Sequence, residues 1–248
     1  MIFDVLTLFP GMFDSPLQES IVGRAIRQGL LQVRAHQLRD WAEGKHLAVD
    51  DTPYGGGDGM VMKPEPVARA IAALKQQSPA AKVLLMTPQG TPFRQRHALE
   101  LANETGLIFV CGRYAGFDER IRQTLVDEEF SIGDFVLTGG ELPAMAMIDA
   151  IARLLPGVLG SNDSAATDSF MDGLLESPQY TRPAVFNGIP VPDVLLSGDH
   201  GRITRWRREQ QMVRTLQRRP DLLEQAQLSS EDKDFLDRLR RKAGGGQQ

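Results

Sequence analysis

The chain has 248 residues, of which 42% are hydrophobic and 24% charged, and its formal net charge is −4 at pH 7. These values are typical of a globular protein with one large domain or two small ones, and the acidic balance gives no overall sign of nucleic-acid binding. A single cysteine, Cys111, excludes an intrachain disulfide and favours a reducing compartment. No basic segment precedes the first apolar residues, so we expect a cytoplasmic protein without a signal peptide.

Membrane insertion is also unexpected. The most apolar expected helix, around residues 145–155, contains Asp149 and Arg153. It is too short and too charged to span a bilayer.

Apolar runs and helical periodicity alternate over the first 155 residues. Strands are expected at residues 2–9, 31–38, 83–87, 107–111 and 135–137. Helices are expected at residues 16–30, with Leu17, Ile21, Ala25 and Leu30 on one face, and at 64–77, 95–104, 118–126 and 141–155. Residues 41–62 are polar and glycine-rich, which is typical of a loop or lid. The alternation predicts an α/β fold with a mostly parallel sheet.

The composition changes after residue 155. Residues 156–166 are rich in small and polar residues, which predicts a linker. A helix at 200–219 is expected to end at Pro220, with Ile203, Trp206, Gln210, Val213 and Leu216 along one side and Trp206 facing a core. A last helix at 229–242 is expected to be capped by Ser229 and Asp232, before a disordered tail. We therefore expect domains at 1–159 and 171–248, the second small and helical, joined by a flexible linker at 160–170.

The most informative string runs from Ser131 to Pro143, SIGDFVLTGGELP. Two adjacent glycines after an expected strand let the backbone approach a ligand closely, and ligands of open α/β sheets bind at the carboxyl ends of strands. The string closely resembles the cofactor loop of the bacterial tRNA (guanosine-N1)-methyltransferases, a family of the knotted SPOUT methyltransferase superfamily.

The resemblance covers nearly the whole chain. It extends over the segments 7–13, 53–57, 59–62, 88–90, 111–114, 118–120, 168–170, 180–183 and 194–198. Two positions depart from the family pattern: Ala115 stands where the family usually has Glu, and Asp58 where it usually has Pro.

The resemblance implies S-adenosylmethionine-dependent methylation of N1 of the guanosine immediately 3′ of the anticodon in tRNA. It also implies a deep trefoil knot and a homodimer in which Asp168 of one chain acts in the cofactor site of the other. The family's use of Mg²⁺ stays open here, because Ala115 replaces a carboxylate, and no metal ligand is assigned.

Guanine N1 carries a proton that must leave as the methyl group arrives, and negative charge then develops on O6. By resemblance, Asp168 is the expected general base and Arg153 the partner of O6. From spacing alone, Asp168 is better interpreted as a cap or loop residue and Arg153 as a surface residue of an amphipathic helix. The motif match is what favours the catalytic roles.

The cofactor site is carried over in the same way to residues near three expected strand ends. These are Leu85, Thr87, Pro88, Gly90, Gly112, Tyr114, Ile132, Gly133, Asp134, Phe135, Val136, Leu137, Gly139 and Gly140. The alternative for each glycine is a plain tight turn. Cys111 lacks an obvious base partner and is expected to be a buried thiol.

The expected helix at 200–219 contains seven arginines and one acid, Glu209. Its net charge of +6 makes it a candidate phosphate-binding element, with Arg202, Arg205, Arg208 and Arg214 as expected tRNA contacts. The alternative is a solvated face with ion pairs inside the helix.

Two rival functions remain open from the sequence. A non-catalytic RNA-binding protein would need only the arginine-rich helix. A nucleotide-dependent enzyme would use the glycine loop at 55–59, although this loop lacks the Lys-Ser/Thr of a P-loop.

Overall fold

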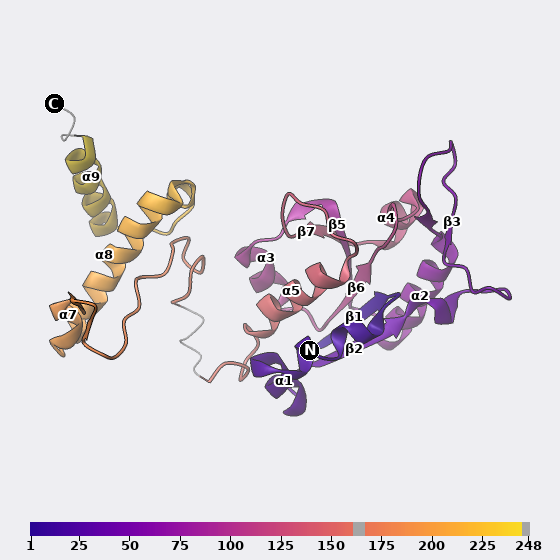
Figure 1. Cartoon of the computed structure of the whole chain (residues 1–248), viewed down its shortest axis with the longest axis horizontal. Coiled ribbons are helices and arrows are strands. Elements are labelled where there is room, and N and C mark those ends of the chain that lie inside the picture. Colours follow the sequence, from indigo (N-terminus) through magenta and orange to yellow (C-terminus); the bar gives the residue numbers. More distant parts are fainter. Residues whose placement is uncertain (161–166, 245–248) are drawn as a thin grey trace. The chain divides into compact units, whose positions relative to one another are not determined.

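The computed structural model describes residues 1–160 and 167–244, and Figure 1 shows the whole chain. The chain divides into two compact units, Met1–Asn162 and Asp163–Gln248. The expected linker at 160–170 overlaps this division, but residues 161–166 lie outside the described residues. Of the expected disordered tail at 244–248, Gly244 ends the last helix and residues 245–248 also lie outside the described residues. No helix in the described ranges has the length and apolarity to cross a membrane.

The first unit contains a five-stranded parallel sheet, which confirms the expected α/β class. Its strand order is β2-β1-β6-β5-β7, and every neighbouring pair is parallel. The strands are β1 (Ile2–Thr7), β2 (Gln32–Gln37), β5 (Lys82–Pro92), β6 (Gly106–Cys111) and β7 (Glu128–Ser131).

Helices cover both faces of this sheet, and two separate cores result. One core lies under α1 (Ser20–Arg27), α3 (Gln95–Leu101) and α5 (Glu141–Ala152), and the other under α2 (Pro64–Gln77) and α4 (Glu119–Leu125). Adjacent β6 residues alternate between them, with Phe109 in the first and Val110 in the second. Because both faces of the sheet are covered at its centre, the central strand β6 (GLIFVC) is an apolar run without a polar side.

The expected strand at 135–137 is wrong. The fifth strand is β7, which begins with Glu128 and Glu129, and Phe135 and Val136 lie in the loop after it, 54% and 85% exposed in this unit. β7 is at the edge of the sheet, where charged residues are tolerated, so its sequence lacks the apolar run of a central strand.

Two other expectations need correction. The helix at 16–30 is shorter, because a separate 3₁₀ turn at Pro16–Gln18 precedes α1 and Ser20, the first residue of α1, has a non-helical φ of 53°. Ile21 is consequently 39% exposed instead of lying on the buried face. The segment 41–62 contains a small antiparallel ribbon, β3 (Asp50–Asp51) with β4 (Val61–Met62), within the expected loop.

The second unit is mainly helical. It contains a hairpin, β8 (Val185–Phe186) with β9 (Ile189–Pro190), then α7 (Asp193–Leu196), α8 (His200–Arg218), a 3₁₀ turn at Pro220–Glu224 and α9 (Ser230–Gly244). Its small core is formed by Leu174, Met212, Leu223 and Leu236.

Two helix-boundary predictions in this unit, the stop at Pro220 and the cap formed by Ser229 and Asp232, are confirmed. Pro220 follows the end of α8 as expected, and the Ser229 hydroxyl accepts from the amide of Asp232 at 3.1 Å while the Asp232 carboxylate accepts from that of Ser229 at 3.1 Å. The expectation for Trp206 is not met, because its side chain is only half-buried and lies outside the core. The centroid of its ring is 6.4 Å from that of the Tyr180 ring. The face of α8 that reaches the core carries Met212 and Thr215 instead.

Candidate functional site: a cleft at the ends of three strands

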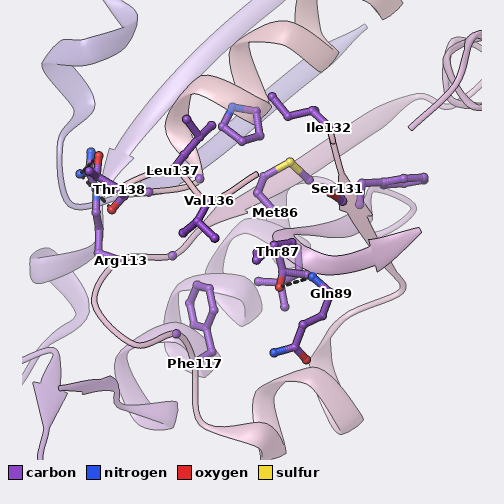
Figure 2. A pocket seen from close by; sticks show the side chains of 18 of the residues that line it. Met86, Thr87, Gln89, Arg113, Phe117, Ser131, Ile132, Val136, Leu137 and Thr138 are labelled. Atoms are coloured by element: carbon purple, nitrogen blue, oxygen red, sulfur yellow. Dashed lines mark hydrogen bonds between the residues drawn. The ribbon is translucent and has the colours of Figure 1, made fainter. Parts of the chain in front are cut away.

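A cleft of about 400 Å³ lies beside the carboxyl ends of β5, β6 and β7 (Figure 2). Its walls come from residues 85–89 of β5, from the loops that follow β6 and β7, from α4 and from the start of α5. All of the expected cofactor residues line it except Gly90 and Asp134. The structure also adds lining residues that were not expected: Met86, Gln89, Ala115, Phe117, Glu119, Arg122, Ser131, Thr138 and Pro143.

Gly90 and Asp134 lie outside the lining for different reasons. Gly90 belongs to β5 at the register shift toward β7, where an added Cβ would lie 2.5 Å from the amide nitrogen of Phe130. Its role in the fold is therefore a close backbone approach. Asp134 is exposed in the loop after β7.

Two of the glycines that line the cleft, Gly112 and Gly140, also pack tightly within the protein. A Cβ at Gly140 would lie 2.8 Å from Cα of Cys111, and one at Gly112 would lie 2.4 Å from the Phe117 ring. Gly140 is buried and precedes α5 directly. A larger side chain at Gly140 would therefore first meet the backbone of β6, and it would disturb the fold as well as any ligand in the cleft.

Arg113 holds the walls of the cleft together. Its guanidinium donates to the Thr138 carbonyl at 3.3 Å and to the Thr138 hydroxyl at 3.2 Å (Figure 2). It also donates to Glu141 Oε1 at 3.3 Å, and its Nη2 lies 3.0 Å from Glu141 Oε2. The loop after β6 is thus tied to the loop after β7 and to the first turn of α5.

Glu141 is the buried carboxylate at this junction, with its side chain 1% exposed. The Thr7 hydroxyl, at the end of β1, donates to its Oε1 at 2.7 Å. Oε2 has the charge of Arg113 beside it but no hydrogen-bond donor in good alignment. Sequence reasoning missed this residue, although an acid in the first turn of a helix is a recognisable signal for an anchor at the positive helix end.

The opposite wall of the cleft is also fixed by polar contacts. Arg122 donates to the Gln89 side chain at 2.7 Å and forms an ion pair with Glu129, which raises the pKa of the guanidinium. The backbone amide of Gln89 donates to the Thr87 hydroxyl at 3.3 Å (Figure 2). Cys111 is buried beneath the cleft, and this burial raises the pKa of its thiol well above the usual range. A thiol kept neutral in this way is a poor nucleophile, as expected.

The cleft offers few ligands to a metal ion. Among residues 1–160 and 167–244, no three His, Cys, Asp or Glu side chains converge to hold one. Ala115 presents a methyl group at its lining position, and an added Cβ at Gly59 would lie 3.7 Å from it. Mg²⁺ prefers several oxygen ligands, so the donor set near Ala115 does not fit it.

The two expected catalytic residues belong to different units. Arg153 directly follows α5 in the first unit and is half-buried. Asp168 lies in a turn of the second unit, is half-buried, and its carbonyl accepts from the amide of Met171 at 3.4 Å. Their expected roles stay predictions.

The arginines of α8 fall into two groups. Within the described part of the second unit, no carboxylate lies at ion-pair distance from Arg202, Arg205 or Arg214. Arg208, in contrast, binds Asp172 and Asp232, which lie outside the helix. Counting only the acids within α8 therefore missed the two carboxylates that pair with Arg208. This pairing weighs against Arg208 as a phosphate contact.

Together these features define an α/β protein with a loop-lined ligand cleft at the carboxyl ends of parallel strands. A family model described as tRNA (Guanine-1)-methyltransferase TrmD matches residues 1–225. The chain belongs to this family.

The match to curated relatives extends over all or nearly all of their length. The chain is 66% identical over 248 residues to the tRNA (guanine-N(1)-)-methyltransferase of Syntrophotalea carbinolica, with 100% of both chains covered. It is 60% identical over 241 residues to the protein of the same name from Geobacter sulfurreducens, covering 97% of this chain and 98% of the relative. The corresponding protein of Dehalococcoides mccartyi is 56% identical over 240 residues, with 96% and 97% covered.

Proposed function

We propose that this protein transfers the methyl group of S-adenosylmethionine to N1 of a guanosine in tRNA, the nucleotide immediately 3′ of the anticodon. The observation that carries the proposal is the strand-end cleft, lined by residues of the family's cofactor motifs in a chain that matches the family model over residues 1–225. S-adenosylmethionine supplies the electrophilic methyl group, so the protein needs no covalent nucleophile.

In this proposal the cleft binds and orients the methyl donor. Backbone groups of the segments that line the cleft would read the adenine edge and the ribose. The apolar side chains of Leu137, Val136 and Phe117 would cover the adenine ring. The Arg113–Glu141 network keeps the loops at a constant separation, so the site is formed before the ligand arrives.

The remaining chemistry is the loss of the N1 proton. Asp168 is the proposed base, and a carboxylate within hydrogen-bond reach of N1 would accept the proton as the methyl group arrives. Arg153 is the proposed partner of O6, where its positive charge offsets the charge that develops. Arg202 and Arg205, which are exposed, and Arg214, which is half-buried, are the proposed contacts of α8 to tRNA phosphates.

The proposal includes three further family properties. The loops at the cleft would belong to a deep trefoil knot. The active form would be a cytoplasmic homodimer in which Asp168 of one chain serves the cofactor site of the other. Mg²⁺ dependence is not part of it, because the carboxylate expected beside the cofactor motif is Ala115.

The experiment is methyl transfer from labelled S-adenosylmethionine to an unmodified tRNA with guanosine 3′ of the anticodon. We expect one methyl group per tRNA at N1, located by mass spectrometry of the digested nucleosides, and none when this guanosine is replaced by adenosine. Parallel reactions with EDTA test the metal. Tight tRNA binding without S-adenosylmethionine binding would favour the non-catalytic RNA-binding alternative, which no comparison supports.

A further inference from the structure

Arg208 lies at the centre of a charge cluster that joins three segments of the second unit. It comes from the middle of α8, and its Nη1 contacts the Asp172 carboxylate in the turn after Asp168. Its Nη2 donates to Asp232 Oδ2 at 2.9 Å and to the carbonyl of Gln227 at 2.9 Å. Burial alone lowers the pKa of Arg208, but the hydrogen bonds that it donates to Asp232 and Asp172 outweigh this effect, and the net pKa is raised.

The turn that bears Asp168 depends on this cluster for its shape. Asp172 Oδ1 accepts from the amide of Leu174 at 3.2 Å, and its carbonyl accepts from the amide of Gln227 at 3.2 Å. Next to it, a Cβ added at Gly173 would lie 2.7 Å from Cα of Ala226. Leu174 itself is fully buried in the core. Asp172 is thus fixed on both its side chain and its backbone.

Further hydrogen bonds fix the backbone between Asp168 and Asp172. The amide of Phe170 donates to the carbonyl of Leu174 at 2.7 Å, which closes the turn. The hydroxyl of Ser169, adjacent to Asp168, accepts from the amide of Glu176 at 2.9 Å. Phe170 has φ of 75°, an unfavourable value for a residue with a side chain, so its surroundings must hold this turn in place.

We propose that Arg208 and Asp172 are positioning residues: their ion pair anchors the Asp168–Leu174 turn to α8 and so presents the Asp168 carboxylate to the reacting guanosine. This inference rests on the proposed function, in which Asp168 is the base. It assigns Arg208 to the chemical step through Asp168, and not to the tRNA phosphates.

Two carboxylates share Arg208, and this makes the inference testable. Asp232 caps α9 through the reciprocal hydrogen bonds with Ser229 and lies away from the Asp168 turn in the chain. Asp172→Asn removes the anchor of the turn, whereas Asp232→Asn removes the other half of the cluster. Arg219→Gln is a matched control, because it removes an exposed arginine and its ion pair with Asp221 from the same unit.

The measurements are kcat and tRNA KM of the full chain at saturating S-adenosylmethionine, with the midpoint of thermal unfolding. We expect Asp172→Asn and Arg208→Gln to lower kcat by about 10- to 100-fold, the scale of a misplaced catalytic group, with little change in tRNA KM. Asp172→Glu should restore most of the rate. Asp232→Asn should lower the unfolding midpoint with kcat retained, and Arg219→Gln should leave kcat unchanged.

Hydrogen exchange provides a second readout that does not depend on activity or on the folding of the arginine variant. In Asp172→Asn the amides of Phe170 and Glu176 should exchange faster, while those of α8 keep their protection. Wild-type kcat in Asp172→Asn, or a rise in tRNA KM alone in Arg208→Gln, would overturn the positioning role. Asp168→Asn distinguishes the base role of Asp168 from the positioning role of Asp172 and Arg208. If Asp168→Asn abolishes turnover while Asp172→Asn does not, only the positioning inference fails. If Asp168→Asn keeps its turnover, the base assignment fails and the inference falls with it.

Discussion

Arg113 in the first unit and the arginines of α8 in the second show two uses of the same side chain. Arg113 is mostly buried and is held by Glu141 and Thr138, so its charge organises the cleft. Arg205 and Arg214 have no ion-pair partner in the described part of the chain and can offer their charge to a ligand. Arg208 lies on the same helix as these two but behaves like Arg113. The role of an arginine therefore follows from the carboxylates that the fold brings to it.

The largest effect should come from breaking the buried pair. Arg113→Met would leave the Glu141 carboxylate in the interior without its counter-charge, and we expect a loss of about 3–5 kcal/mol in the free energy of unfolding. Chemical denaturation measures it. The double variant Arg113→Met with Glu141→Gln should recover part of the loss, since the uncompensated charge is gone. A loss below about 1 kcal/mol would mean that the Arg113–Glu141 pair contributes no more to stability than an exposed surface ion pair. Arg113 would then not differ in this respect from the arginines of α8.

Asp168→Asn tests the chemical step that would link the two regions. The amide keeps the shape of the carboxylate but cannot accept the N1 proton, so we expect kcat to fall by ~10²-fold or more. S-adenosylmethionine affinity, measured by calorimetry, should change little. Turnover near that of the wild type with saturating tRNA would remove Asp168 from the role of base.

Gly140→Ala sharpens the difference between a backbone-built cleft and a side-chain surface. The added Cβ would lie 2.8 Å from Cα of Cys111. We expect a loss of about 1–3 kcal/mol in stability, as for other overpacked sites, together with weaker S-adenosylmethionine binding. Gly160→Ala is the control, because nothing lies within 4 Å of a Cβ there. Unchanged stability with weakened binding would show that Gly140 contacts the ligand and not β6.

The smallest effect per residue should come from the arginines of α8 that have no ion-pair partner within the described part of the second unit. Charge reversal of Arg205 and Arg214 should raise the tRNA KM without altering S-adenosylmethionine affinity. Each lost phosphate contact should also reduce the log–log salt dependence of tRNA binding by ~0.7–0.9. Binding curves across a salt series measure this slope. Identical slopes for variant and wild type would mean that these arginines are only a solvated face, and the search for the tRNA surface would move to the loop near Lys45 and Lys63.

The sequence by itself determined the elements whose signals are local. The helix at 64–77 was expected with the bounds of α2, because its apolar spacing and leading proline act within a few residues. The cap formed by Ser229 and Asp232, and the stop at Pro220, followed for the same reason. The motifs also located the cleft, since residues that follow parallel strands meet at one edge of the sheet.

Only the tertiary structure decided how side chains were used. In the folded chain Phe135 and Val136 lie in the cleft wall, and the charged segment at 128–131 forms β7, the edge strand of the five-stranded sheet. The fold brought Cys111 against Gly140, Glu141 to Arg113, and Asp172 to Arg208. The partners of the first ion pair are 28 residues apart in the chain and those of the second are 36 residues apart. No local sequence pattern can therefore predict these pairs. Burial and pairing of charges depend on which distant segments pack together, and that is settled only when the whole fold forms.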